Sequence, residues 1–234
     1  MNICIIPARG GSKRIPKKNI KTFCGTPIIG YSIKAALESN LFEHVLVSTD
    51  DDEIAEVACA MGAQTPFIRP ASLSDDHCAT LPVIQHAIDW ARESLGNLDY
   101  VCTLYATAPF VTSQILTSAY KQLVGLPQKE YAFGVCAFPS SIQRAFKKTE
   151  NQGVEMFNPE YFNTRSQDLE EAFFDAGQFY WGKADAFSHG LKMFESHSLP
   201  IVLPQHLVQD IDTLADWIRA EAMFNANNSI KGAT

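Results

Sequence analysis

Apolar and polar positions alternate between two kinds of spacing along this chain. Residues 3–6 are apolar without interruption, which is typical of a short strand buried on both faces of a sheet. From residue 80 to residue 95, apolar residues recur at three- and four-residue intervals, the spacing of an amphipathic helix. The same criteria predict strands at 2–7, 45–48, 65–69, 100–104, 131–138, 178–181 and 201–203, and helices at 27–37, 49–61, 80–95, 113–124 and from 213 onward.

This order of elements predicts the class of fold. Parallel strands need crossover connections, and the helices in those connections cover both faces of the sheet. We therefore expect residues 1–234 to form a single α/β domain with a Rossmann-like, mostly parallel sheet flanked by helices.

The alternation stops between about residues 139 and 172. Polar residues, Gly153 and Pro159 interrupt any helical or strand period there. A segment of this length without regular structure is uncommon inside a compact domain. We interpret it as an insertion arm within the domain, and a mobile surface flap is the alternative.

Composition narrows the classes of protein. The 234 residues carry a net charge of −7, which disfavours general nucleic-acid binding. No apolar run approaches the roughly 20 residues that span a bilayer, and the start does not resemble a signal peptide. The six cysteines are scattered without a C-x-x-C pair, which argues against disulfides and a zinc site. We expect a cytoplasmic protein without a membrane or nucleic-acid partner.

Residues 7–19, the basic segment, concentrate positive charge directly after the first predicted strand. Five cations surround the pair Gly10-Gly11, at positions Arg9, Lys13, Arg14, Lys17 and Lys18. Glycines allow a backbone turn to approach a ligand closely, and successive N–H groups in a turn can hold an anion. The segment therefore favours a polyphosphate ligand. A solvated loop or a nucleic-acid arm is the alternative.

Asp210 and Asp212, the acidic doublet, are the second candidate site. In extended chain, residues i and i+2 point the same way, so the two carboxylates lie side by side. A divalent cation between them would offset their repulsion, and Mg²⁺ prefers a few carboxylates together with phosphate oxygens and water. The alternative is that Asp212 only caps the last helix.

The topology predicts that these clusters converge. Ligands of open parallel sheets bind beyond the carboxyl ends of the strands. The basic segment follows the first strand and the acidic doublet follows the last. Further polar groups follow the strands between them, at Thr49–Asp52, Arg69 and Tyr105–Thr107.

The basic segment resembles a known motif. The run Ala8-Arg9-Gly10-Gly11-Ser12-Lys13, with Ile15-Pro16 and Lys18-Asn19, resembles the first motif of the nucleoside-diphospho-sugar transferase (GT-A-like) superfamily. Within that superfamily it is similar to the acylneuraminate cytidylyltransferases, which also carry an Asp-x-Asp before the terminal helix. The resemblance implies that the chain uses CTP, Mg²⁺ and a nonulosonic acid sugar, and that the arm helps to form a homodimer.

The resemblance also implies roles for single residues. The catalytic group would be Arg9, Lys13, Lys18, Asp210 and Asp212, with the two aspartates as metal ligands. The nucleotide-binding group would be Pro7, Ala8, Arg9, Gly10, Gly11, Ser12, Asn19, Arg69, Asp76 and Thr80.

The acceptor end differs from the sialic-acid enzymes of this family. Those enzymes commonly carry a glutamine where this chain has Tyr105. Residues 162–168 and 175–182 resemble the pseudaminic acid branch of the family, which implies that CTP and pseudaminic acid become CMP-pseudaminic acid and pyrophosphate. The implied sugar contacts are Tyr105, Arg165, Gln178 and Tyr180.

Other functions stay open on the sequence alone. The acceptor could instead be N-acetylneuraminate, legionaminate or 3-deoxy-manno-octulosonate. A nucleotide-binding module without catalysis is the alternative from another class of protein.

Overall fold

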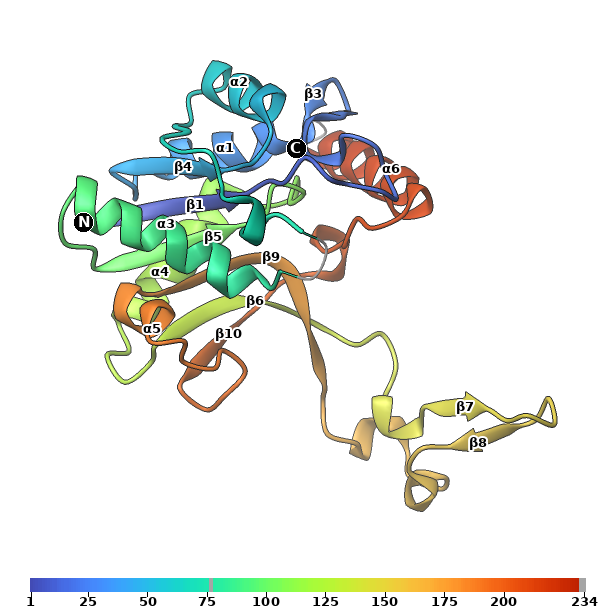
Figure 1. The fold of residues 1–234 in the computed structure, drawn as a ribbon. Coiled ribbons are helices and arrows are strands. Elements are labelled where there is room, and N and C mark those ends of the chain that lie inside the picture. The colour runs from blue at the N-terminus through green and yellow to red at the C-terminus, as the bar shows by residue number, and fades with distance from the viewer. Residues whose placement is uncertain (76–77, 232–234) are drawn as a thin grey trace.

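A six-stranded mixed sheet forms the centre of the molecule, with the strand order β10-β6-β9-β5-β1-β4 (Figure 1). The structure is a computed structural model that describes residues 1–75 and 78–231, with side chains up to residue 229. The strands of this sheet are β1 Asn2–Pro7, β4 His44–Ser48, β5 Tyr100–Leu104, β6 Tyr131–Ala137, β9 Phe173–Lys183 and β10 Ser198–Val202.

Helices cover both faces of the sheet, as the alternation in the sequence predicted (Figure 1). They are α1 Ile28–Ser39, α2 Asp52–Ala60, α3 Thr80–Ser94, α4 Ser113–Val124, α5 Ala184–Ser188 and α6 Leu214–Lys231. Two small antiparallel pairs are β2 Thr22–Phe23 with β3 Thr26–Pro27, and β7 Phe146–Lys148 with β8 Val154–Met156. Short 3₁₀ turns lie at Lys18–Ile20, Ala71–Leu73, Ile142–Arg144, Pro159–Tyr161, Ser166–Asp168 and Gln205–Leu207.

The sheet is mostly parallel, with one antiparallel strand in its middle. β1 pairs in parallel with β4 and β5, and β10 pairs in parallel with β6. β9 runs antiparallel to both of its neighbours, β5 and β6. Its first half therefore lies at the edge of the sheet where β1 and β5 end, which is the edge that carries the candidate site.

The predicted strand at 65–69 is wrong. Only isolated bridges form there, Leu46 with Gln64 and Thr49 with Ile68. Pro66 and Pro70 lack the N–H that a ladder needs, so continuous pairing along β4 is interrupted.

The core lies on both faces of β1, because successive side chains of a strand point to opposite sides. Cys4 and Ile6 belong to the buried cluster that α1, α2 and α4 share, whereas Ile3 and Ile5 belong to the cluster of α3 and α5. All four are fully buried, and complete burial of an isoleucine side chain stabilises the fold by about 1.5–3 kcal/mol.

A third buried cluster joins the basic segment to the C-terminal part of the chain. It contains Ile15 from the basic segment, Ile211 from the acidic doublet and Trp217 from α6, among other residues. A capping box begins α6: Thr213 N donates to Asp216 Oδ2 at 2.9 Å, and Asp216 N donates to Thr213 Oγ1 at 3.3 Å. The cluster and the cap fix where the doublet lies.

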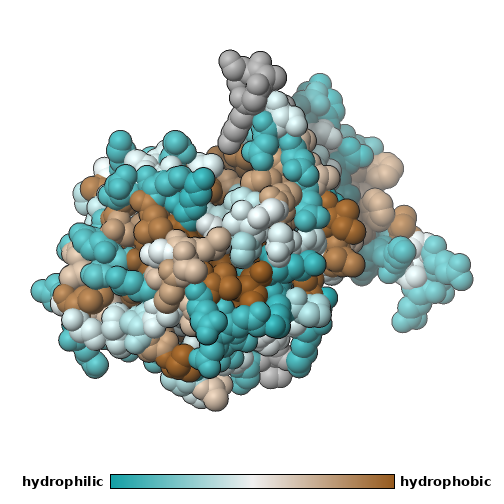
Figure 2. All heavy atoms as spheres, turned by 90° about the horizontal axis from the view of Figure 1, so that it is seen from above, coloured by the Kyte–Doolittle hydropathy of each residue, from teal (hydrophilic) through white to brown (hydrophobic). Residues whose placement is uncertain are grey.

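Residues 138–172, the arm, leave the body between β6 and β9 and carry the β7–β8 hairpin (Figure 1). Several large apolar side chains of the arm are exposed, namely Phe146, Val154, Phe157 and Phe162. In Figure 2 the arm projects from the rest of the molecule, with brown and tan atoms among its teal ones. Within the part of the chain that is described, no helix has the length and apolar character to cross a membrane.

Candidate active site

A cavity of about 630 Å³ opens where β1 and β5 end. Positive side chains from the basic segment line one part of it, and Tyr105, which follows β5, lines another. The lining residues are Pro7, Arg9, Ser12, Lys13, Arg14, Lys18, Asn19, Arg69, Leu73, Asp75, Cys78, Thr80, Val83, Tyr105, Ala106, Thr107 and Asp212.

Hydrogen bonds from several elements hold the basic segment in place. Ala8 N donates to Ser48 O at 2.9 Å, which continues the pairing of β1 with β4. Asn19 Nδ2 donates to Arg9 O at 2.9 Å and closes the segment on itself. Lys17 has a left-handed backbone with φ 52° and pairs with Glu53 of α2. These contacts therefore fix the backbone that carries the positive side chains of the basic segment.

Gly10 occupies a position that admits no side chain. Its N–H donates to Asp50 Oδ1 at 3.0 Å, and an added Cβ would lie 2.5 Å from Asp51 Oδ2. Asp51 is the N-cap of α2, where its side chain accepts from Ile54 N, so it cannot easily move aside. For Gly11, none of the described residues has an atom within 4 Å of an added Cβ. The requirement for glycine is thus specific to the first of the pair.

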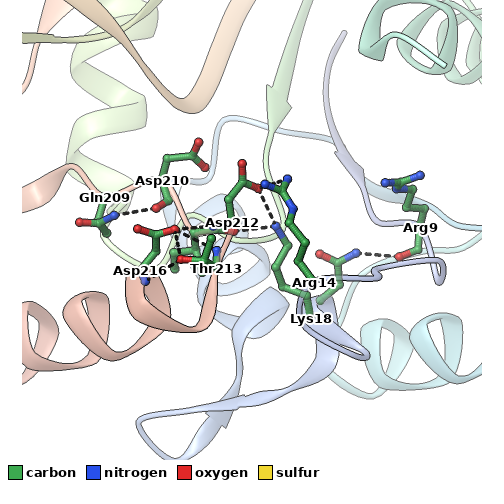
Figure 3. Close-up of polar contacts among 10 residues, drawn as sticks. Arg9, Arg14, Lys18, Gln209, Asp210, Asp212, Thr213 and Asp216 are labelled. Atoms are coloured by element: carbon green, nitrogen blue, oxygen red, sulfur yellow. Dashed lines mark hydrogen bonds and ion pairs between the residues drawn. The ribbon is translucent and has the colours of Figure 1, made fainter. Parts of the chain in front are cut away.

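The acidic doublet meets the basic segment at Asp212 (Figure 3). Arg14 Nη2 lies 3.0 Å from Asp212 Oδ1, and Lys18 Nζ lies 3.4 Å from the same oxygen. Lys18 also donates to Ile211 O at 2.6 Å. Because Ile211 is fully buried between the two aspartates, its packing anchors the doublet to the body.

Asp210 lies beside Asp212, and the pKa of its carboxyl is raised. Burial raises the pKa of the Asp210 carboxyl, the Asp212 charge raises it further, and Lys18 opposes the shift. Among the described residues, no group of three or more His, Cys, Asp or Glu side chains could hold a metal. Asp212 lines the cationic cavity and Asp210 lies beside it, outside the lining; such a pair nevertheless fits Mg²⁺, which commonly takes one or two protein carboxylates and completes its shell with phosphate and water.

Arg69 lines the cavity, and hydrogen bonds to Ser48 hold its side chain in place. Only 4% of it is exposed; its Nε donates to Ser48 Oγ at 3.1 Å, and its Nη2 donates to Ser48 O. Burial lowers the pKa of Arg69, and the Asp50 carboxylate counters that shift. Because a guanidinium loses its proton only at strongly alkaline pH, the side chain stays charged and adds a fixed positive group to the cavity.

The residues expected to contact the sugar lie at different depths. Tyr105 lines the cavity, with its hydroxyl 3.4 Å from Thr80 Oγ1. Tyr180 and Gln178 are buried outside the lining; Tyr180 packs against Tyr105, and Gln178 Nε2 donates to Leu207 O at 2.7 Å. Arg165 lies on the arm and forms a bidentate pair with Asp168 at 2.7 and 3.2 Å.

The structure brings most of the expected nucleotide-binding and catalytic residues to one cavity. Those in the lining are Pro7, Arg9, Ser12, Lys13, Lys18, Asn19, Arg69, Thr80 and Asp212. Ala8, Gly10, Gly11 and Asp210 lie next to lining residues in the chain but outside the lining itself. Asp76 lies outside the described residues.

Arg14 and Asp50 are among the residues near the site that were missing from the sequence-based assignment. Arg14 pairs with Asp212, and its place in the basic run was the available signal. Asp50 accepts from Gly10 N, and nothing in the spacing of the acidic run distinguished it from Asp51 or Asp52.

Comparison with known proteins gives a consistent assignment. A family model described as cytidylyltransferase matches residues 3–227. The pseudaminic acid cytidylyltransferase of Campylobacter jejuni is 46% identical over 227 residues, which cover 97% of each chain. A Helicobacter pylori protein named pseudaminic acid cytidylyltransferase and UDP-2,4-diacetamido-2,4,6-trideoxy-beta-L-altropyranose hydrolase is 37% identical over 89% of this chain and 40% of its own length.

A solved structure shares the fold. The CMP:2-keto-3-deoxy-manno-octonic acid synthetase complexed with CTP superposes with a TM-score of 0.68 over 97% of this chain and 99% of that one, at 16% identity. This confirms the expected α/β fold with a mostly parallel sheet flanked by helices. Together with the match over residues 3–227, these relatives show that the chain belongs to the cytidylyltransferase family.

Proposed function

We propose that this protein transfers the CMP group of CTP to pseudaminic acid and releases pyrophosphate. The anomeric hydroxyl oxygen of the sugar attacks the α-phosphorus of CTP. The bond from that phosphorus to the oxygen bridging the α- and β-phosphates breaks, and the hydroxyl proton is lost. The nucleophile belongs to the acceptor, so no covalent intermediate with the protein is required.

One observation carries this proposal: the cations of the basic segment and Asp212 of the acidic doublet line a single cavity. Arg9, Lys13 and Lys18 line it together with Asp212. Positive groups that are already in place neutralise the triphosphate and the leaving pyrophosphate without reorganising during the reaction. The cavity therefore suits a nucleoside triphosphate and a second polar substrate.

Mg²⁺ is part of this proposal. Asp210 and Asp212 would hold it, and the ion would supply positive charge and Lewis acidity at the phosphates. Arg14 and Lys18 contact Asp212 in the structure, and they would hold the same carboxylate in position at the edge of the cavity.

Pseudaminic acid is the acceptor that the comparisons support. The Campylobacter jejuni relative, named for this substrate, matches 97% of the chain at 46% identity. N-acetylneuraminate, legionaminate and 3-deoxy-manno-octulosonate are the acceptors against which it should be measured. The product would serve glycosylation of a surface glycan or flagellin, and the reaction would take place in the cytoplasm.

A homodimer belongs to the same proposal. Arg165 lies on the arm, which projects away from the body, and its partner there is Asp168 (Figure 1). A bidentate contact of Arg165 with the carboxylate of the sugar would therefore need the arm of a second copy. The exposed apolar side chains of the arm would be covered in such a dimer.

A pyrophosphate-release assay tests the proposal. Purified protein is incubated with CTP, Mg²⁺ and each of the four acids in turn, and the nucleotide sugar is identified by mass spectrometry. We expect the highest kcat/KM with pseudaminic acid. Absence of turnover with every acid would refute the enzyme assignment, and a clear preference for another acid would refute the acceptor assignment alone.

A further inference from the structure

A bulge in β9 changes the course of this strand next to the cavity. Asp175 pairs with Val135 and Tyr180 pairs with Phe133, so the register between β9 and β6 shifts between these two pairs. Gly177 has φ +62° within the bulge, a conformation that favours glycine, and its N–H donates to Asp175 Oδ1 at 3.0 Å. The bulge thereby turns Asp175 back toward its own strand.

The second oxygen of Asp175 fixes a buried tyrosine. The Tyr180 hydroxyl donates to Asp175 Oδ2 at 2.6 Å, and Tyr180 is only 6% exposed. Burial first, and then Tyr105 and Asp175, raises the pKa of Tyr180 above its ordinary value. Tyr180 therefore stays protonated and keeps donating to the carboxylate.

Tyr180 in turn supports the ring of Tyr105. Their ring centroids lie 5.5 Å apart at an interplanar angle of 55°. The backbone of Tyr105 is held on both sides, because its N–H donates to Gln178 O at 2.8 Å and its carbonyl accepts from Ser32 Oγ at 2.8 Å. With the backbone fixed, the position of the Tyr105 ring depends on Tyr180, which packs against it, and on Thr80, whose Oγ1 lies 3.4 Å from its hydroxyl.

We infer that Tyr105 selects the acceptor sugar and that Asp175 is a positioning residue that acts on Tyr105 through Tyr180. The inference rests on the proposed function and adds the basis of its acceptor preference. It assigns a role to Asp175, which does not line the cavity, and an indirect role to Tyr180.

The chemistry of the cavity indicates what Tyr105 would select. Cations line the part that suits the triphosphate, whereas Tyr105 lies with Val83 and Ala106 in the lining and offers an aromatic face and one hydroxyl. An acylamino group matches this surface, because its methyl group can pack on the ring while its N–H or C=O bonds to the phenol. A hydroxyl group offers no methyl to pack. We therefore assign the preference to acylamino-substituted sugar acids over acids that carry hydroxyl groups only.

The test compares two acceptors at saturating CTP. Pseudaminic acid bears acylamino groups, and 3-deoxy-manno-octulosonate bears none. In Asp175→Asn and Tyr180→Phe, we expect KM for pseudaminic acid to rise about fivefold, the effect of one lost hydrogen bond, while KM for CTP stays within about twofold. Tyr105→Ala should reduce the ratio of the two kcat/KM values by about tenfold or more.

Tyr131→Phe is the matched control. It also removes a buried phenol, whose hydroxyl donates to Leu191 O at 3.0 Å, but Tyr131 is not part of the cavity lining. We expect both KM values of this variant to match the wild type. Thermal unfolding of all four variants shows whether each is folded at the assay temperature.

The possible failures are distinguishable. Wild-type protein that turns over neither acid overturns the proposed function and the inference with it. Active wild type whose variants keep an unchanged KM for pseudaminic acid overturns the inference alone. So does a rise in KM that is equal for CTP and the acceptor, because it would indicate a general disturbance of the cavity.

Discussion

Lys18 and Asp212 are 194 positions apart in the sequence, yet Lys18 Nζ lies 3.4 Å from Asp212 Oδ1. The same ammonium donates to the carbonyl of Ile211 at 2.6 Å. The backbone bond holds Lys18 in place independently of the carboxylate. The lysine therefore joins the basic segment to the acidic doublet and stays available to a phosphate.

This relationship predicts a large catalytic effect. We expect Lys18→Met to lower kcat/KM by about 10²-fold, because loss of one preorganised donor to a developing charge commonly costs on the order of 10²–10³ in rate. The measurement is steady-state pyrophosphate release. Lys34→Met is the control, since the Lys34 side chain is 71% exposed and pairs with Glu38 on the surface of α1. Equal losses in both variants would contradict a specific role for Lys18.

The two glycines of the basic segment should respond differently to alanine. In Gly10→Ala the new Cβ would press on Asp51, and overpacking of this kind costs about 1–3 kcal/mol. We expect a lower melting temperature and a higher KM for CTP. Gly11→Ala should keep the melting temperature of the wild type, because no atom of the described residues lies within 4 Å of its Cβ position. Calorimetry measures the melting temperatures, and a CTP titration of activity measures KM. Equal melting temperatures of Gly10→Ala and Gly11→Ala would contradict the steric role of Gly10.

Neutralising the acidic doublet should affect metal dependence. We expect Asp210→Asn and Asp212→Asn each to reduce Mg²⁺-dependent turnover by more than about 100-fold, because the remaining carboxylate would hold the ion poorly. A Mg²⁺ titration of activity is the measurement. Asp185→Asn is the matched control: the Asp185 side chain is 79% exposed, pairs with Arg92 and lies outside the cavity lining, so we expect an unchanged Mg²⁺ dependence. Wild-type Mg²⁺ dependence in either doublet variant would exclude this metal site.

Charge on the arm should disrupt the proposed dimer. Phe146 is 63% exposed and Phe157 is 61% exposed, so the double variant Phe146→Glu/Phe157→Glu should not harm the folded body. We expect it to sediment as a monomer, because burying two carboxylates in an interface is costly. Phe194→Glu is the control on the body, where the phenylalanine is 69% exposed. A wild type that itself sediments as a monomer would end the dimer proposal.

Alkaline pH should destabilise the protein through Tyr131. Burial, followed by the charge of Glu130, raises the pKa of Tyr131 to about 12 from an ordinary value of 10. The folded state thus holds the phenol proton more tightly than the unfolded state does. The stabilisation that this proton gives the fold is fully present below pH 10 and is lost as the pH rises to about 12. Thermal unfolding is measured at pH 8, 10, 11 and 12. The melting temperature should fall less with rising pH in Tyr131→Phe than in the wild type. Parallel curves for the two proteins would contradict the assignment.

Much of the fold could be predicted from spacing because its strands are buried on both faces. An uninterrupted apolar run such as residues 3–6, within the strand Asn2–Pro7, has few alternative structures. The region 65–69 contains the apolar pair Phe67-Ile68 but carries Pro66, and its pairing fails for a reason that apolar spacing does not detect. β9 extends from Phe173 to Lys183, well beyond the predicted 178–181, because the bulge at Gly177 breaks the alternation that marks a strand.

The meeting of distant residues was predictable only at the level of elements. The rule that ligands bind beyond the ends of parallel strands placed the basic segment near the acidic doublet. It did not predict that Arg14 pairs with Asp212, since that contact depends on how both segments pack around Ile15 and Ile211. The Asp175–Tyr180 hydrogen bond was hidden for a similar reason, because it needs the turn at Gly177.

The arm leaves and re-enters the sheet at one pair of partners, Ala137 of β6 and Phe173 of β9. Neighbouring antiparallel strands can be closed by a two-residue turn such as Asn-Gly. Excising residues 138–172 and inserting this turn would therefore leave every strand of the main sheet and its register intact. The shortened chain would keep the cavity but lack the arm. Its activity would therefore show what one subunit does without any contribution from a second.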